Sequence, residues 1–580
     1  MRRLLVLPIF AAAALTCHAD PIDVSVARSV ASRVLAASKG KAVETVSAEM
    51  DNEVKSRMAV SPVEAPAFYT FNAADGNGFV IVSGDDDFPA VIGYSDHGTI
   101  SSAVEMPLAL VDYLETYSRY VADVRSGQAR KPDAGQMRFA SSAPVVEPLC
   151  GSTWGQDDPF NAYCPLDNGK RSLVGCTATA MAQIMYKWKF PERARGTVLY
   201  NSGLGVINED MSSDTHIYNW SAMKPTTAGN RLSSAKKAVA QLNYDCGITA
   251  KMEYSKDGSG AYEEDAMIAF RTNFCYNAQT LRLIFRDCFA DVAAWNAVLY
   301  DELTAGRPVL FSASSLSGSG SDAAGHAFVI DGCDGEGLVH VNWGWNGSCD
   351  GYYDITRLDP KEEGYNTGYV FSESQTMVIG IAPGEGNEAV PQTRMVLEDA
   401  PAVEMSSVSL GAAFDLSVLS IYSRTLYKQT WTVGIGLFSK DGELLDVVSS
   451  VEDKANTFTL EGWYGYKQRT VRCTIPASFA DGDYVLRVMT RQSGYEEWAL
   501  PDVVGGDSRN WIPVYVASGT ANFNKVSTSV NGVPADMGEV VSRHYTDLSG
   551  RRVAVPEKGR TVIEVLTLSG GKQVSVKRVF

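Results

Sequence analysis

Two stretches decide the fold class of this chain: VGCTATAMAQIMYKWKFP at residues 174–191 and GHAFVIDGCDGEGLVHVNWGWNGSCDGYYDI at residues 325–355. The first has no proline between Cys176 and Pro191, so its small and apolar residues predict one helix that begins at the cysteine. The second alternates short apolar runs with glycine-rich turns, which is typical of antiparallel strands. Helices followed by a late antiparallel sheet predict an α+β fold.

Apolar patterns on either side extend these stretches into one central domain, which we place at residues 144–385. The turn at 333–337 should join the strand that begins at His326 to the strand that holds Asn342, as an antiparallel hairpin. Further helices are predicted at 234–242, 263–273 and 291–303, and further strands at 308–313 and 376–382.

A separate α+β N-terminal unit is expected at residues 20–143. It combines helical periodicity at 24–35, strands FYTFN and GFVIVSGDD around a glycine turn, a third strand AVIGYSDHG, and the amphipathic helix PLALVDYLETYSRYVADV. The following stretch SGQARKPDAGQMRFASSAPVV is rich in small, polar and proline residues. Such a linker is exposed to proteases.

The C-terminal part alternates short strands with turns after the linker PGEGNEAVPQ. Regular spacing of such strands over residues 393–523 predicts an immunoglobulin-like β-sandwich. Residues 526–580 are too few for an independent enzyme and predict a short β tail.

The N-terminus, MRRLLVLPIFAAAALTCHAD, joins two arginines to an apolar run and a small-residue exit, which predicts a signal peptide over residues 1–19. A lipoprotein signal acylated at Cys17 is the alternative. Export leaves nine cysteines, an odd number that is consistent with one free thiol and an even set of eight.

Composition limits the classes of partner. The formal net charge of −17 argues against nucleic acid or an anionic membrane surface. No stretch after the signal is long enough to span a bilayer. Because cysteine pairs and histidine clusters at metal-binding spacing are absent from the sequence, we expect neither a metal nor a cofactor.

Cys176 is the candidate nucleophile. At a helix N-terminus its thiolate would meet free N–H groups and the positive end of the helix dipole, and a nearby imidazolium would lower the thiol pKa further. From this segment alone, a buried cysteine that caps a core helix is equally plausible.

Three histidines of the central domain could serve that cysteine. His326 follows a serine- and glycine-rich run and leads a strand, which suits an imidazole at the edge of a cleft. His216 is expected in a surface loop, and His340 is expected as a hydrogen-bonded histidine inside a strand. His326 is therefore the candidate acid and base.

The remaining roles of a thiol hydrolase also have candidates. Asn342 could orient the His326 ring, and the indole of Trp343 could shield that hydrogen bond from water. Gln156, on a loop upstream of the cysteine, carries an amide that could stabilise an oxyanion. Each residue alone also has an ordinary explanation, as part of an aromatic core strand or of the surface.

Taken in order, WGQDDPFN, GCTATAMAQIMYKWKFP, GHAFVIDGCDGEGLVHVNWGWNGSCDGYYDI and VIGIAP resemble the streptopain family of secreted, papain-like cysteine peptidases. The resemblance covers most of the central domain. It implies that Cys176 is the nucleophile and His326 its partner. The resemblance also assigns these further roles: Asn342 as orienter, Trp343 and Trp345 as shields, Gln156 as oxyanion donor, and Gly325 and Ser259 at positions that bind the substrate backbone.

The segment FYTFNAADGNGFVIVSGDDDFPAVIGYSDHG resembles the prodomain of the same family. This implies that the N-terminal unit inhibits the peptidase until the linker is cut, roughly between Lys131 and Val145. The tail segment HYTDLSGRRVAVPEKG resembles the C-terminal sorting domains of Bacteroidetes type IX secretion substrates, which implies contact with a secretion machinery or the cell surface. A plain β-hairpin cap on the sandwich is the alternative.

The leading hypothesis is thus a secreted or cell-surface cysteine endopeptidase, made as a zymogen, which acts on proteins or peptides. The same Cys176–His326 pair could instead transfer the acyl group to an amine, as a transglutaminase does. The third hypothesis is a surface adhesin whose β-sandwich binds glycan or host protein beside an inactive peptidase core.

Overall fold

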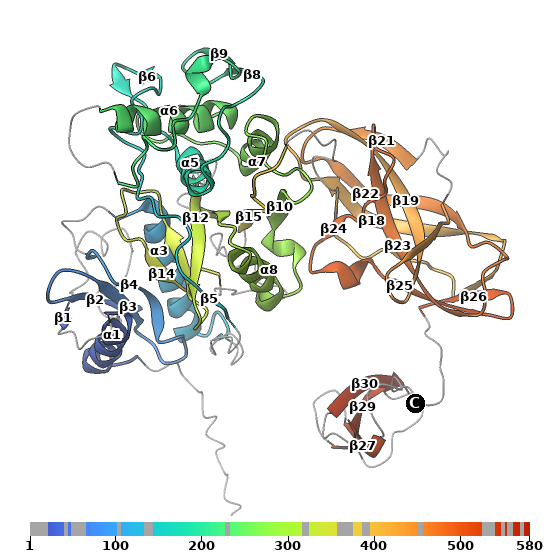
Figure 1. The fold of residues 1–580 in the computed structure, drawn as a ribbon. Coiled ribbons are helices and arrows are strands. Elements are labelled where there is room, and N and C mark those ends of the chain that lie inside the picture. The colour runs from blue at the N-terminus through green and yellow to red at the C-terminus, as the bar shows by residue number, and fades with distance from the viewer. Residues whose placement is uncertain are drawn as a thin grey trace, which may run out of the picture.

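A computed structural model describes most of the chain between residues 21 and 579 (Figure 1). The expected signal peptide, most of the linker after the N-terminal unit and the run before His326 lie outside the described residues. The described residues are 21–39, 45–47, 65–100, 106–132, 143–226, 233–315, 324–356, 375–385, 395–449, 456–524, 540–546, 552–553, 561–568 and 573–579.

In the described part of the N-terminal unit, helices α1 and α3 pack against a small antiparallel sheet. The turn between β2 and β3 falls at the predicted glycines, with Gly76 at φ 68°. Its elements are α1 (Val24–Lys39), β1 (Thr45–Ser47), β2 (Phe68–Ala73), β3 (Phe79–Ser83), β4 (Val91–Ser95) and α3 (Leu108–Arg125).

The central domain places its long helices before most of its main strands, as predicted, and the α+β fold class is confirmed. Its helices are α5 (Cys176–Trp188), α6 (Ser234–Thr249), α7 (Glu263–Thr272) and α8 (Val292–Thr304). Its main strands are β10 (Arg282–Phe285), β11 (Val309–Ser315), β12 (Ala324–Asp334), β13 (Val339–Asn342), β14 (Gly351–Tyr353) and β15 (Thr376–Ile379), and the edge strand β5 is Val145–Val146. Two short hairpins, β6 (Leu166–Asp167) with β7 (Lys170–Arg171) and β8 (Thr197–Asn201) with β9 (Val206–Asp210), complete it.

The N-terminal unit and the central domain share one sheet of 11 strands, in the order β1-β2-β3-β4-β14-β13-β12-β11-β15-β10, with β5 beside β12. The junction is an antiparallel pairing of β4 with β14, in which Tyr94 is opposite Tyr352 and Gly93 is opposite Tyr353. The rings of Tyr94 and Tyr352 stack with centroids 5.2 Å apart. The N-terminal unit is thus joined to the central domain by strand addition.

Strand β12 separates two hydrophobic cores. Ala327 and Val329 pack with α5 on one side. Phe328 and Ile330 pack on the other side, in a core that also contains residues of α3 from the N-terminal unit. Neighbouring side chains of a strand point to opposite faces. Odd- and even-numbered residues at this part of β12 therefore meet different cores.

The C-terminal strands form two sheets around a third core. One sheet holds β16 (Met395–Leu397), β18 (Ala413–Ser423), β22 (Gly465–Thr474) and β24 (Asp502–Val503). The other holds β17 (Ser407–Ser409), β19 (Gln429–Ser439), β20 (Leu444–Val447), β21 (Thr457–Leu460), β23 (Gly482–Gln492), β25 (Ile512–Ala517) and β26 (Thr520–Phe523). This arrangement is the predicted β-sandwich. The tail adds a sheet of β27 (Val540–Thr546), β28 (Arg552–Val553), β29 (Thr561–Leu568) and β30 (Gln573–Val579).

Candidate active site

Cys176 is the first residue of α5, as the sequence predicts. Gly175 caps the helix at φ 91°, a conformation that favours glycine. A side chain at Gly175 would also meet Met252 at 2.6 Å and the carbonyl oxygen of Ser259 at 3.0 Å. The tight glycine turn therefore places the cysteine sulfur at the start of the helix, where backbone N–H groups lack helical partners.

The sulfur of Cys176 lies against β12. Its Sγ accepts a hydrogen bond from the Ala327 N–H, at 3.4 Å. The pKa of this thiol is raised, because burial outweighs the hydrogen bond from Ala327, and the Glu263 carboxylate raises it further. The expectation of a lowered pKa is therefore wrong for this conformation, in which the His326 imidazole has another partner.

That partner comes from the N-terminal unit. Nε2 of His326 lies 2.6 Å from Oδ2 of Asp112 on α3, and both side chains are mostly buried, with 12% and 14% exposed. His326 shares the parity of Phe328, so its ring lies on the face of β12 that α3 covers. Cys176 packs on the opposite face, with Ala327. The two candidate dyad residues are held on opposite faces of one strand.

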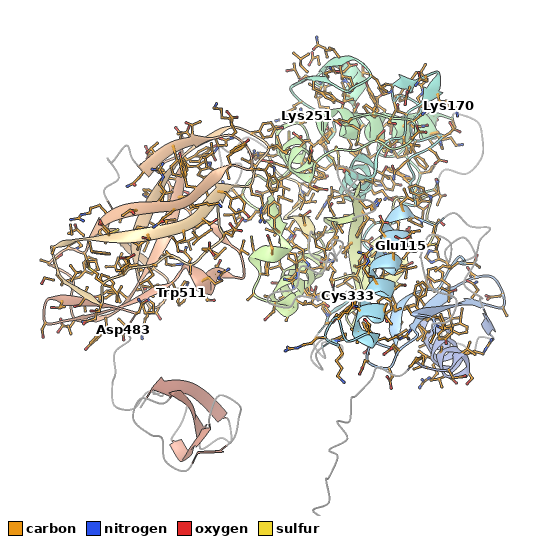
Figure 2. All side chains as sticks on the ribbon, turned by 180° about the vertical axis from the view of Figure 1, so that it is seen from behind. Glu115, Lys170, Lys251, Cys333, Asp483 and Trp511 are labelled. Carbon is orange, nitrogen blue, oxygen red and sulfur yellow. The ribbon has the colours of Figure 1, made fainter. Side chains whose placement is uncertain are left out.

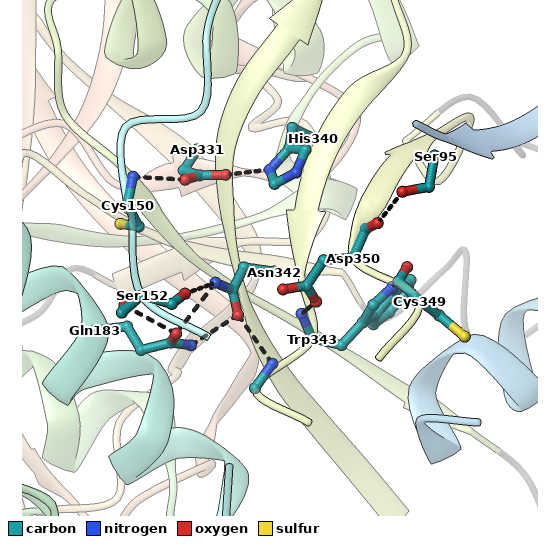
Figure 3. A network of polar contacts seen from close by, with 11 residues as sticks. Ser95, Cys150, Ser152, Gln183, Asp331, His340, Asn342, Trp343, Cys349 and Asp350 are labelled. Atoms are coloured by element: carbon teal, nitrogen blue, oxygen red, sulfur yellow. Dashed lines mark hydrogen bonds and ion pairs between the residues drawn. The ribbon is translucent and has the colours of Figure 1, made fainter. Parts of the chain in front are cut away.

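Asn342, the predicted orienter, is tied to α5 instead (Figure 3). Its Oδ1 accepts hydrogen bonds from Gln183 Nε2 at 2.8 Å and from the Gly344 N–H at 3.1 Å. Its Nδ2 donates to the Ser152 carbonyl at 2.7 Å and to Gln183 Oε1 at 3.1 Å. All four hydrogen-bonding positions of the amide are filled. In this conformation Asn342 connects β13 to α5, and Asp112 is the residue at His326.

Trp343 is buried in the core that contains α3. Its Nε1 donates to the Cys349 carbonyl at 3.0 Å, and its N–H donates to Asp350 Oδ1 at 2.9 Å (Figure 3). Its ring centroid lies 4.9 Å from that of Phe328, which points to the same face of β12 as His326. Trp345 is partly buried against the same core.

The remaining candidates lie around Cys176. Gln156 is half-buried, and its carbonyl accepts the Val174 N–H at 2.9 Å, two residues before the nucleophile. Gly325 is exposed beside His326. The Ser259 hydroxyl donates to the Leu173 carbonyl at 2.8 Å, so its side chain holds a loop in place while its backbone borders Gly175.

The other two histidines are buried in ion pairs. His340 lies 2.6 Å from Asp331, which confirms a hydrogen-bonded strand histidine (Figure 3). His216 is 2% exposed, and its Nδ1 lies 2.9 Å from Asp245 on α6. The predicted surface position of His216 is therefore wrong. Its neighbours Tyr218 and Trp220 carry it into the core, and that aromatic pattern was the available signal.

No sequence pattern points to Asp112, which lies 214 residues from His326. The cysteine count was also uninformative. All nine cysteines in the described ranges are free thiols, seven of them buried, so parity does not single out Cys176. No grouping of three potential metal ligands occurs within the described residues. Across the same residues, no helix is both long and apolar enough for a membrane span.

Comparisons with known proteins find relatives of both the central domain and the N-terminal unit. Residues 154–353 match the Peptidase C10 family, and residues 19–121 match the Spi protease inhibitor family. Streptopain of Streptococcus pyogenes is 31% identical over 335 residues, which are 54% of this chain and 80% of streptopain. The Peptidase C10 range contains Cys176 and His326, and the inhibitor range contains Asp112.

Two further proteins are similar to this chain: one matches a longer part of it, and the other has a solved structure. The thiol protease/hemagglutinin PrtT of Porphyromonas gingivalis is 31% identical over 456 residues, which are 75% of this chain. The chain spans only 50% of the length of PrtT. A solved prointerpain A fragment of Prevotella intermedia is 30% identical, with a TM-score of 0.47, over 58% of this chain and 99% of that chain.

Proposed function

This chain belongs to the streptopain family of cysteine endopeptidases, and on that premise we propose that it is a secreted zymogen with Cys176 and His326 as its catalytic dyad. The observation that carries the proposal is the contact between His326 and Asp112. A histidine next to the residue that touches the cysteine sulfur is held by a carboxylate from the inhibitor-like unit. That is the arrangement expected of a silenced dyad.

The catalytic steps follow from these side chains. Once His326 turns to the Cys176 face of β12, the imidazole takes the thiol proton, and the thiolate attacks the peptide carbonyl. The Gln156 amide and the Cys176 N–H stabilise the oxyanion. His326 then protonates the leaving amine and activates the water that hydrolyses the thioester.

The other predicted residues keep supporting roles in the proposal. Trp343 and Trp345 shield the imidazole, and the backbone at Gly325 and Ser259 binds the substrate main chain. For Asn342 Oδ1 to accept an N–H from His326 after activation, it must give up the bond from Gln183 Nε2 or from the Gly344 N–H, because both acceptor positions of the oxygen are filled.

The N-terminal unit acts as the inhibitor in this proposal. Strand pairing with β14, a shared core and the Asp112 contact all hold it on the central domain. Cutting the linker between Lys131 and Val145 frees the unit to leave. His326 then loses its carboxylate partner, and α3 no longer covers its face of β12.

Export places the enzyme outside the cell or on its surface. The N-terminal signal supports export, and the tail resembles sorting domains that contact a secretion machinery. The acid-rich chain, with a net charge of −17, suits a soluble hydrolase of protein and peptide substrates.

Replacement of the nucleophile tests the proposal. The Cys176→Ala chain should remain full length and should not digest casein, whereas the wild type should shorten at its N-terminus and digest it. Mass spectrometry of the products should show hydrolysed peptides. Cross-linked peptides would point to acyl transfer to amines, and caseinolysis by Cys176→Ala that equals the wild type would refute the dyad.

A further inference from the structure

We propose that the β-sandwich positions the substrate side of the active site through one short loop, Arg424–Tyr427, which we call the hook. This inference rests on the proposed function, because it concerns residues 251–265, the segment that lies beside Cys176. Figure 2 shows Lys251, the first residue of this segment, where the central domain meets the sandwich. The sandwich is then a working part of the peptidase rather than a detachable module.

The hook holds the N-terminus of α7. The Thr425 hydroxyl and the Leu426 N–H both donate to the carboxylate of Glu264, the latter at 2.6 Å. Thr425 and Glu264 are buried, with 1% and 5% exposed. Hydrogen bonds to a buried carboxylate are strong and directional, so this contact fixes the first turn of α7 relative to the sandwich.

Tyr427 contacts the ion pair between Lys251 and Asp265, which joins the two ends of residues 251–265. Lys251 Nζ lies 2.8 Å from Asp265, so the two ends of residues 251–265 meet. The Tyr427 hydroxyl donates to Asp265 and accepts from Lys251, and its ring lies 4.4 Å from the Lys251 ammonium. One residue of the sandwich therefore bonds to both ends of the segment.

Arg424 anchors the hook to a second element of the central domain. Its guanidinium forms two bonds of 2.7 Å with the carboxylate of Asp287. It also lies over the Phe285 ring, 4.5 Å from the centroid. The Gly505 N–H adds a 2.7 Å bond to the Asp287 carbonyl. This bidentate pair is largely shielded from water, so the domains are joined at two separate places.

The other side of residues 251–265 is bonded to the nucleophile region. The Ala261 carbonyl accepts the Thr177 hydroxyl at 3.0 Å, one residue after Cys176. The Ser259 hydroxyl donates to the Leu173 carbonyl at 2.8 Å. Ala261 is only three residues from Glu264. A displacement of the hook would therefore move Glu264 and, with it, the Ala261 carbonyl that bonds to Thr177.

The segment between α6 and α7 needs such support. Apart from one bridge between Glu253 and Gly260, it has no regular backbone pairing of its own. Its interior is held by Met252 and Tyr254 in the core and by bonds from Tyr200 to the Met252 carbonyl and from the Lys256 N–H to Asp167. Its α7 end depends on the hook and on the Thr177 bond to Ala261. Loosening the hook lets the segment sample other positions, and substrate binding must then order it at an entropic cost. The expected effect is weaker binding with little change in the chemical step.

Two nearly isosteric variants of the full chain test the proposal: Thr425→Val and Tyr427→Phe. Each removes one hydroxyl that bonds to a charged group, so we expect KM to rise about three- to tenfold in the matured enzyme, with kcat within about twofold of the wild type. Arg472→Ala is the matched control, because it breaks an exposed ion pair with Asp415 on the sandwich itself. Unchanged KM in both variants would overturn the proposal, as would full activity after the sandwich is cut off and lost.

A second measurement does not depend on activity. Hydrogen exchange in the Cys176→Ala full chain should be faster over residues 251–265 when Tyr427→Phe is added, and unchanged when Arg472→Ala is added. Equal exchange in all three chains would contradict the positioning role. If the wild type neither digests protein nor reacts with a thiol-protease inhibitor, the proposed function fails, while faster exchange would still support the mechanical link.

Discussion

Asp112 and His326 are 214 residues apart in sequence, yet their side chains meet at 2.6 Å between the N-terminal unit and the strand beside Cys176. In the proposed zymogen, this contact is what keeps the peptidase silent. It occupies Nε2 of the imidazole and keeps the ring on the face of β12 that lies away from the sulfur.

Removing this carboxylate should speed maturation. Asp112→Ala leaves His326 without its partner, so we expect the N-terminal unit to be lost at least several-fold faster than in the wild type. Asp112→Asn, which keeps an acceptor without the charge, should be intermediate. Gel electrophoresis over time measures the rate. Arg119→Ala on the exposed side of α3 is the control, and a rate for Asp112→Ala equal to that control would show that the contact does not maintain latency.

The strand junction should be sensitive to one methyl group. A Cβ at Gly93 would lie 2.4 Å from the Tyr353 ring, so Gly93→Ala should push β4 away from β14. We expect earlier release of the N-terminal unit and a lower melting temperature of the Cys176→Ala zymogen. Gly151→Ala, where a methyl group meets open space, is the matched control. Melting that is the same in both variants would argue against tight packing at the junction.

The amide network around Asn342 should contribute to stability. Gln183→Leu removes partners from Asn342, from the Ser152 hydroxyl and from the Trp154 N–H, all in the buried interior. Buried polar groups left without partners cost about 1–3 kcal/mol each, so unfolding of the central domain should be easier by about 3 kcal/mol. Denaturant unfolding of the Cys176→Ala chain measures this. Gln468→Leu on the exposed face of β22 is the control, and equal midpoints would contradict the prediction.

Zymogen stability should fall as pH rises. Burial raises the pKa of Asp350 to about 7. Burial disfavours the charged form of His340, but Asp331 outweighs it, and with further help from Asp350 and Asp96 the pKa of His340 is raised. Both groups therefore bind more protons in the folded state than in the unfolded state, so the free energy of unfolding declines as pH rises through these pKa values.

The melting temperature of the Cys176→Ala zymogen, measured between about pH 5 and about pH 8, should reveal this decline. Asp350→Asn keeps an acceptor for the Trp343 N–H but cannot ionise, so its decline should be shallower. Ser95 of the N-terminal unit donates to the Asp350 carbonyl at 2.7 Å, which places the effect at the junction of the two parts. If the melting temperature falls equally with pH in the chains with and without Asp350→Asn, Asp350 does not contribute to the pH dependence.

Features that depend on residues close together in the sequence were predicted correctly. The helix at Cys176, the hairpin from His326 to Asn342 and the glycine turn of the N-terminal unit all follow from periodicity and turn residues. The candidate site residues came from the order of the motifs, and their catalytic roles remain a prediction. None of these patterns indicates which face of β12 the His326 ring occupies, because both faces are buried and both accept apolar neighbours.

The features that were missed depend on contacts distant in sequence. Asp112 lies in an ordinary amphipathic helix, and the hook is an unremarkable turn between two strands of the sandwich. Asn342 was expected at the imidazole because it lies in the neighbouring strand, but the Gln183 amide on α5 fills its hydrogen bonds. Tertiary packing decides such pairings, and a single sequence does not record them.

The most direct test labels the full-length protein with an epoxide-type thiol-protease inhibitor and locates the label by mass spectrometry, before and after the N-terminal unit is removed. A silenced Cys176–His326 dyad predicts almost no label in the zymogen and stoichiometric label on Cys176 after removal, with Asp112→Ala labelled already at full length. No label on Cys176 after removal, or equal labelling of the zymogen and the processed enzyme, would contradict it.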